Sequence, residues 1–354
     1  MSSESERARP GAHHTEHETV MIGSRNDIGR ERWLDRVVSA ELSGMDDLKR
    51  YLIDEIVEDY EDGRITRRDA MATLVGLTGA ALGAQLLAAC GKSDTKVAAT
   101  GSGSGSGPQL PGPPQSPDSV KADDPAVVAA WAEFPGEGAT LRGYLARPAR
   151  AGKVPIVLVC HENRGLTAHI EDVTRRAAKA GYLAIAVDLL SREGGSTQMK
   201  YEEVPGVLGK APPERHVADF RAGLAYARTQ QAARGDRVGM VGFCFGGGVT
   251  WRVAAAVPEL TAAVPFYGIP VEVDNIAGIG AAVLAICAET DDRINGALPA
   301  VEAAMKAHGK AFKQIVYPGT QHAFHNDTGQ RYVMAAAQAA WRETMAWFAQ
   351  YLNA

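Results

Sequence analysis

The 354-residue sequence has few cysteines, few aromatic residues and no excess of positive charge. The four cysteines, Cys90, Cys160, Cys244 and Cys287, are too few and too scattered for a disulfide framework or a C-x-x-C zinc site. Aromatic residues make up 6% of the chain, and the formal net charge is −5 at pH 7. Because that charge offers no basic footprint for a phosphate backbone, we expect no nucleic-acid partner. No internal repeat is visible.

Residues 1–63 are expected to form a polar tail followed by short amphipathic helices. Apolar residues recur at three- and four-residue steps from 30 to 62, and Gly44 is expected to divide this stretch into two helices. Such helices bind partners or membrane surfaces. Acidic side chains such as Glu55 and Asp59 argue against a surface of anionic lipid.

Residues 64–90 resemble a twin-arginine export signal with a lipobox. Arg67 and Arg68 precede the uncharged stretch 71–89, and Leu-Ala-Ala-Cys ends at Cys90, which would carry the lipid. We therefore expect an exported protein, periplasmic or at the cell surface, tethered to the membrane by lipid at Cys90. An uncleaved membrane anchor is the alternative, because the apolar stretch is nearly long enough to span a bilayer. Membrane contact is expected only through this segment.

Glycine, serine and proline dominate residues 91–119, which predicts a flexible linker. The remaining residues, 120–354, are expected to form one folded domain. With 45% hydrophobic and 22% charged residues, the chain can bury a full α/β core.

Strand-like and helix-like stretches alternate along this domain. Repeated βα units predict a doubly wound, mostly parallel sheet with helices on both faces, and ligands bind such sheets beyond the carboxyl ends of the strands. The expected strands are 128–134, 140–146, 154–160, 183–187, 238–242, 260–267, 281–287 and 312–317, and the expected helices are 170–180, 213–231, 298–308 and 332–351.

The stretch Gly-Phe-Cys-Phe-Gly, residues 242–246, follows an apolar strand and precedes a helix-like run. This is the setting of a nucleophile elbow, G-x-S-x-G, with Cys244 in place of serine. A Cβ at Gly242 or Gly246 would collide with the facing strand or helix in so tight a turn. The alternative is a glycine-rich turn that carries a buried structural cysteine.

Acidic and histidine residues follow other strands at the same edge of the sheet. Asp291 follows the strand that ends at Cys287, and His322 follows the last strand, so nucleophile, acid and histidine come in the chain order of α/β-hydrolases. Asp292 and His325 are the respective alternatives.

Other candidate sites have weaker support in the sequence. His322, His325 and Asp327 could be misread as a metal cluster, but we expect no metal and no cofactor, because no third ordered ligand is supplied. Cys160 and Cys287 end apolar strands and are interpreted as core thiols.

Several motifs together resemble the dienelactone hydrolase family of α/β-hydrolases, the carboxymethylenebutenolidases. The resemblance covers residues 125–352. Its motifs are His161-Glu162-Asn163-Arg164-Gly165-Leu166, Gly181-Tyr182 with Val187-Asp188-Leu189, Gly242-Phe243-Cys244-Phe245-Gly246-Gly247, Asp291-Asp292-Arg293-Ile294 and Gln321-His322-Ala323-Phe324.

This resemblance implies an α/β-hydrolase fold and hydrolysis of a lactone or small carboxylic ester. Cys244 would be the nucleophile that forms a thioester, His322 the general base and then acid, and Asp291 the residue that orients the imidazole. By the same resemblance, Glu162 lies near the nucleophile and helps to control whether the thiol is ionised. At the elbow itself, the helix N-terminus and the histidine are expected to favour the thiolate.

The backbone N–H groups of Phe245 and Asn163 are expected to form the oxyanion hole. Family members use arginine to bind a substrate carboxylate; Arg164 is our candidate, with Arg192 and Arg215 left open. The expected partner is a small ester or lactone. The alternative function is a tethered, non-catalytic α/β domain that only holds a ligand.

Overall fold

The computed structural model of the protein describes residues 45–61, 65–79, 112–150 and 152–353. The prediction of a lipid site at Cys90, the first of the two amphipathic helices and most of the linker lie outside these residues.

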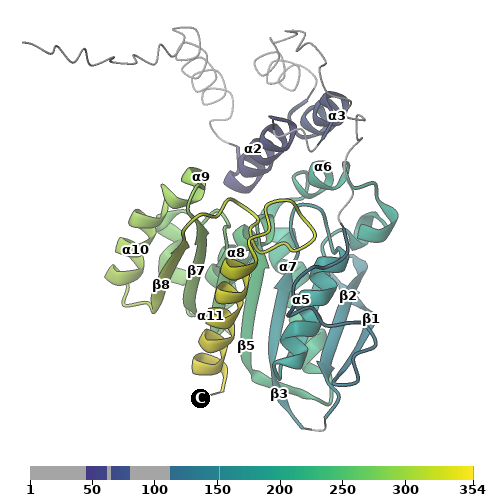
Figure 1. Cartoon of the computed structure of the whole chain (residues 1–354). Coiled ribbons are helices and arrows are strands. Elements are labelled where there is room, and N and C mark those ends of the chain that lie inside the picture. Colours follow the sequence, from purple (N-terminus) through teal and green to yellow (C-terminus); the bar gives the residue numbers. More distant parts are fainter. Residues whose placement is uncertain (1–44, 62–64, 80–111, 151, 354) are drawn as a thin grey trace, which may run out of the picture. The chain divides into compact units, whose positions relative to one another are not determined.

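An eight-stranded sheet forms the centre of the protein, in the order β1-β2-β4-β3-β5-β6-β7-β8 (Figure 1). The pairs β1–β2 and β2–β4 are antiparallel and all other pairs are parallel. The predicted doubly wound, mostly parallel sheet is therefore confirmed. The strands are β1 (Val127–Gly136), β2 (Ala139–Pro148), β3 (Val154–Cys160), β4 (Leu183–Asp188), β5 (Ala233–Phe243), β6 (Ala262–Phe266), β7 (Ala282–Ala288) and β8 (Phe312–Tyr317).

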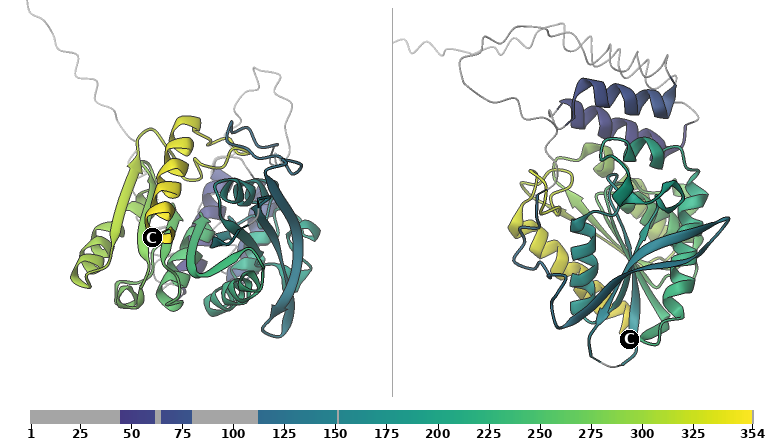
Figure 2. Two further views of the ribbon diagram at one scale, coloured as in Figure 1. Left: turned by 90° about the horizontal axis from the view of Figure 1, so that it is seen from below. Right: turned by 90° about the vertical axis from the view of Figure 1, so that its right-hand side faces the viewer.

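Helices cover both faces of the sheet, as the order of strands and helices predicts (Figure 2). On one face lie α5 (Ala168–Lys179) and α11 (Met334–Leu352), and on the other lie α7 (Pro213–Arg228), α8 (Phe245–Ala256) and α10 (Leu298–Ala307). Every residue of β4 and β7 is buried, because side chains on both sides of these strands pack against helices.

The connection after β4 is more structured than expected. It contains two short 3-10 helices, η1 (Ser191–Glu193) and η2 (Ser196–Gln198), and the one-turn helix α6 (Val204–Leu208). Two further short elements, η3 (Val273–Gly278) and α9 (Asp292–Asn295), follow β6 and β7.

Two N-terminal helices, α2 (Asp47–Glu61) and α3 (Arg67–Thr78), belong to the same compact unit as the sheet, which spans Gly44–Ala354. The carboxylate of Asp46 accepts from the N–H of Leu48 at the start of α2, and the hydroxyl of Thr66 caps α3. Helix α2 contacts α8, and α3 contacts α6. The second predicted amphipathic helix thus corresponds to α2, and its apolar face covers the chain's own α/β domain.

None of the helices in the described part of the chain is long and apolar enough to cross a membrane.

Candidate active site

Cys244 lies at the turn between β5 and α8, with φ 58° and ψ −122°. This is a strained backbone conformation for a residue with a side chain, and the neighbouring glycines allow it. A Cβ on Gly242 would overlap the carbonyl oxygen of Gly246, and a Cβ on Gly246 would overlap that of His161 at the end of β3. Any larger side chain at either position would therefore open the turn.

The structure brings Asp291 and His322 to Cys244. Asp291 directly precedes α9, His322 follows β8, and the imidazole Nδ1 of His322 lies 2.6 Å from a carboxylate oxygen of Asp291. A carboxylate only accepts hydrogen bonds, so Nδ1 carries the proton and Nε2 faces Cys244. Asp292 is exposed, so it does not take the place of Asp291. We call Cys244, His322 and Asp291 the cysteine–histidine–aspartate cluster.

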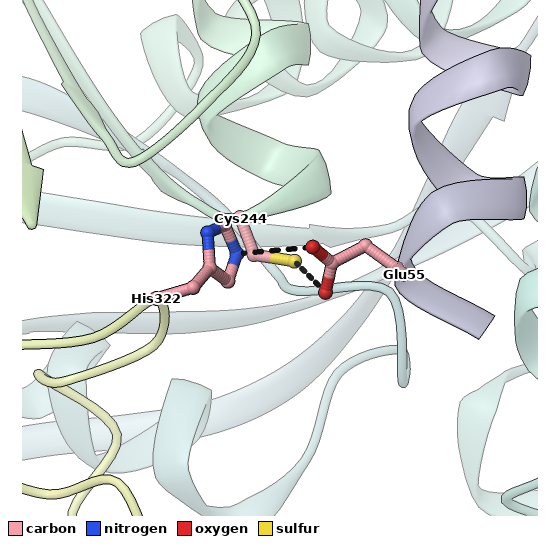
Figure 3. A group of neighbouring side chains, drawn as sticks. All are labelled: Glu55, Cys244 and His322. Carbon is pink, nitrogen blue, oxygen red and sulfur yellow. Dashed lines mark hydrogen bonds and ion pairs between the residues drawn. The ribbon is translucent and has the colours of Figure 1, made fainter. Parts of the chain in front are cut away.

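Helix α2 supplies two further side chains to this cluster that the sequence did not predict. The hydroxyl of Tyr51 lies 3.1 Å from Sγ of Cys244 and 2.8 Å from Nε2 of His322. The carboxylate of Glu55 lies 3.7 Å from that Nε2 and 4.0 Å from Sγ (Figure 3), and it accepts a hydrogen bond of 2.5 Å from Arg293. The amphipathic pattern indicated which residues of α2 are buried, but no local signal indicated their partners.

The surroundings of Cys244 favour the thiol over the thiolate. Burial and the carboxylate of Glu55 raise the pKa of Cys244 and outweigh the attraction of His322. Burial opposes protonation of His322, but Glu55, Cys244 and Asp291 together raise its pKa well above the ordinary value. The expectation that the elbow favours a thiolate is therefore wrong for this arrangement, because neither the burial of the sulfur nor the carboxylate of Glu55 beside it was foreseen.

Glu162 lies in the loop after β3 and is 6% exposed. One carboxylate oxygen accepts a hydrogen bond from Asn326, while the other is buried with no hydrogen-bond partner. Burial raises the pKa of Glu162. The imidazole of His161 bonds the backbone carbonyl of Glu162 at 2.7 Å and so holds the loop that carries Glu162 and Asn163. The sequence pattern alone indicates no role for His161.

The two residues expected to form an oxyanion hole start α8 and follow β3. Phe245 is the first residue of α8, so its N–H has no partner within the helix. Asn163 directly follows Glu162 and is buried.

The three candidate arginines all bind carboxylates of the chain. Arg164 pairs with Asp59 of α2, Arg192 pairs with Asp219 at 2.6 Å, and Arg215 pairs with Glu193 at 2.9 Å. Arg293 lies beside the cluster: it pairs with Glu55, and its Nε lies 4.0 Å from a carboxylate oxygen of Asp291.

Three side chains of the described residues could together hold a metal ion: Glu55, Cys244 and His322, whose donor atoms lie within 4.8 Å of one another. A sulfur, an imidazole nitrogen and a carboxylate suit zinc. The hydroxyl of Tyr51, however, already bonds both Sγ and Nε2, so a metal would have to displace it.

Two residues weighed in the sequence as metal ligands lie elsewhere. The ring of His325 stacks with Phe243 in the core, and Asp327 binds His169 and Arg176.

Comparison with known proteins identifies the relatives of the α/β domain. The dienelactone hydrolase family matches residues 141–352. A Methylorubrum extorquens protein that carries the name carboxymethylenebutenolidase is 34% identical over 245 residues, covering 66% of this chain and 84% of its own. A Bradyrhizobium protein named as a 2-oxo-3-(5-oxofuran-2-ylidene)propanoate lactonase is 30% identical over 234 residues, covering 63% and 94%.

A crystal structure of a dienelactone hydrolase from Klebsiella pneumoniae is also similar. It shares 33% identity and a TM-score of 0.59, covering 64% of this chain and 100% of the other.

The parallel sheet and the strand–turn–helix elbow define the domain as an α/β-hydrolase. The chain belongs to the dienelactone hydrolase family, and it is a hydrolase. Helices α2 and α3 lie outside the residues that the family matches.

Proposed function

We propose that the protein hydrolyses a lactone or small carboxylic ester, with Cys244 as nucleophile. The observation that carries this proposal is the geometry of the cluster: a cysteine on a strained elbow, beside a histidine whose other ring nitrogen is bound to Asp291. This is the arrangement that activates a weak nucleophile by an oriented base.

In this mechanism, Nε2 of His322 accepts the proton of the Cys244 thiol as sulfur attacks the ester carbonyl. The carbonyl oxygen becomes an oxyanion, which accepts hydrogen bonds from the N–H groups of Phe245 and Asn163. The bond between the carbonyl carbon and the alkoxy oxygen of the ester then breaks, and His322 donates its proton to the leaving alkoxide. The acyl group remains on Cys244 as a thioester. Water, deprotonated by His322, then cleaves the thioester, releases the acid and restores the thiol.

Glu162 contributes to the proton balance of this site. The carboxylates of Glu55 and Glu162 both disfavour a negative charge on the nearby sulfur, so the thiol stays protonated until substrate is present. This protects an exported enzyme, because oxidation of cysteine follows its thiolate character and exposure.

The names of two relatives support the substrate class. One is a carboxymethylenebutenolidase, and the other is named for a propanoate that carries an oxofuran ring. We propose a lactone or ester that carries a carboxylate, with Arg164 as the candidate for binding it.

Turnover of a chromogenic aryl acetate tests this proposal. Cys244→Ala should abolish turnover, while Cys287→Ala, which removes a buried thiol at the end of β7, should retain it. The assay should use the full chain and also the double variant Glu55→Gln/Asp59→Asn, in which the contacts of α2 are weakened. Equal turnover by the parent and Cys244→Ala in both backgrounds would contradict the proposal.

We also propose that residues 64–90 direct export and that Cys90 carries a lipid, with the folded domain held at the membrane from outside the cytoplasm. The exposure of Arg67 and Arg68 in the first turn of α3 supports this proposal, because a receptor could read them there.

A further inference from the structure

Helix α2 closes the candidate active site. Cys244 and His322 are each 3% exposed, and Tyr51 and Glu55, which cover them, are 3% and 4% exposed. An ester carbonyl must reach Sγ along a path that is open to solvent. With α2 in this position, the described side chains leave Cys244 and His322 almost no accessible surface, and hence little room for a substrate to reach Sγ.

Tyr51 separates the nucleophile from its base. The hydroxyl of Tyr51 has a single hydrogen, which it donates to Sγ of Cys244, so its contact with Nε2 of His322 is one in which Nε2 donates to the Tyr51 oxygen. Proton transfer from Cys244 needs the lone pair of Nε2, and attack needs the face of the sulfur that Tyr51 occupies. The contact therefore blocks both requirements of the proposed mechanism.

Two ion pairs hold α2 over the site. Glu55 binds Arg293 at 2.5 Å and also faces His322, and Asp59, one helical turn further on, binds Arg164. Glu55 and Asp59 are 4% and 6% exposed, so both carboxylates are largely removed from water. The pKa of Glu55 is lowered, because His322 and Arg293 outweigh the opposing effect of burial.

Apolar packing on the domain complements these pairs. Leu48, Leu52 and Ile56 of α2 are almost completely buried. Leu52 of α2 and Leu77 of α3 both pack against Gly209, the residue that follows α6. Gly209 leaves room for them because it has no side chain. The apolar and the acidic faces of α2 therefore both match this one surface of the domain.

We propose that α2 is an intramolecular inhibitor, which occupies the place of the substrate over Cys244 and must leave before the enzyme acts. The reaction that α2 inhibits is the one given under the proposed function, and in this respect the inference rests on that proposal. Whether α2 covers Cys244 can be tested without measuring turnover. The opposite assignment is that Tyr51 is a catalytic proton donor, in which case α2 would have to stay in place during turnover.

Two variants of the full chain weaken α2 docking in independent ways. Glu55→Gln/Asp59→Asn removes the carboxylates and leaves the partly buried Arg293 and the largely buried Arg164 against neutral amides, a penalty that exists only while α2 is docked. Gly209→Leu places a side chain from the domain into the volume of Leu77 and Leu52, and it changes no charge. Glu302→Gln is the control, because it removes an exposed carboxylate from α10.

The first readout is the rate at which iodoacetamide modifies Cys244, with the site mapped by mass spectrometry. We expect slow modification of the parent and a rise of at least about tenfold in both variants. The loss of a buried ion pair in the first variant, and the overlap with Leu77 and Leu52 in the second, each shift a two-state equilibrium by at least that order. Glu302→Gln should stay within about twofold of the parent, as an exposed charge contributes little. Circular dichroism of each variant establishes that the α/β domain is folded.

The second readout is turnover of the aryl acetate, which should rise in parallel. Faster modification of Cys244 in the two variants, without turnover, would support α2 as a helix that covers the site but would contradict the proposed hydrolysis. Rapid modification and full turnover in the parent, unchanged in both variants, would overturn the inhibitor and leave the hydrolase intact. Tyr51→Phe distinguishes an inhibitory tyrosine from a catalytic one. If Tyr51 blocks the site, this variant should raise both the rate of Cys244 modification and the turnover. A fall in turnover with unchanged modification would show that Tyr51 is catalytic.

Discussion

At the scale of single residues, His322 has the central position. It bonds Asp291 through Nδ1 and meets both Tyr51 and Glu55 through Nε2. His322→Ala should lower turnover by about 10²–10⁴-fold, the usual contribution of a positioned acid–base group. Steady-state kinetics of the aryl acetate provide the measurement. His308→Ala is the control, because His308 is exposed and should leave turnover unchanged; an equal loss in both variants would contradict the role of His322.

The Glu55–His322 pair predicts how pH affects docking of α2. Burial opposes protonation of His322, but the Glu55 carboxylate that α2 brings raises its pKa. The protonated histidine therefore stabilises the docked helix through Glu55, and this contribution is lost as pH rises through the raised value. Docking lowers the pKa of Glu55, so the carboxylate stabilises docking above its ordinary pKa of about 4.3, and this contribution is lost as pH falls through the lowered value. Docking should therefore be firmest between these two transitions.

Hydrogen exchange of the α2 amides, corrected for the intrinsic exchange rate at each pH, measures this effect. Protection should fall toward both alkaline and acidic pH in the parent, and the dependence should flatten in Glu55→Gln. The same pH profile in both proteins would mean that other groups control docking. Arg331, whose guanidinium contacts the His322 carbonyl and which also lowers the pKa of Glu55, would then be examined next.

At the scale of elements, the junction of β5 and α8 determines where Cys244 stands. Gly242→Ala should lower the free energy of unfolding by at least about 2 kcal/mol, because the added Cβ meets the Gly246 carbonyl oxygen of α8, a backbone atom that cannot move alone. Thermal unfolding followed by circular dichroism gives the midpoint. Gly280→Ala is the control, since a Cβ there would lie 3.7 Å from its nearest neighbour, an ordinary contact. Equal midpoints for the two variants would show that the turn relaxes more easily than its geometry indicates.

At the scale of the whole molecule, the inhibitory helix and the proposed export signal lie on the same side of Cys90. Both α2 and α3 precede Cys90 in the chain. Cleavage before Cys90 would therefore sever α2 from the α/β domain, so export and activation of the enzyme would be coupled by one cut.

The export proposal predicts where the protein accumulates. Changing both Arg67 and Arg68 to lysine should leave the protein in the cytoplasm, because a twin-arginine signal is read by its receptor through this pair. Cell fractionation followed by immunoblotting measures the distribution. Lysine at Arg221 and Arg228, two exposed arginines of α7, is the control and should not alter it. An unchanged distribution of the first variant would favour the uncleaved anchor.

The sequence by itself determined the α/β class, most element positions and the residues at the edge of the sheet. The bounds predicted for β3 and β8 agree with the structure. In β3, a continuous apolar run marks a buried strand locally. The elbow at Cys244 was predictable from its local pattern of glycines after an apolar strand. Gly242 is required by contacts with Gly246 and Thr250 nearby in the sequence, whereas the contact that requires Gly246, with His161 after β3, appears only in the folded protein.

Only the tertiary structure decided what surrounds Cys244. Glu55 is 189 residues from Cys244 in the chain and 238 from Arg293, and no local pattern specifies such pairs. The state of the thiol followed from the same contacts, because its pKa depends on burial and on a carboxylate brought there by α2. Periodicity showed that α2 has an apolar face; packing on Gly209 and pairing with Arg164 and Arg293 determined that this face closes the chain's own active site.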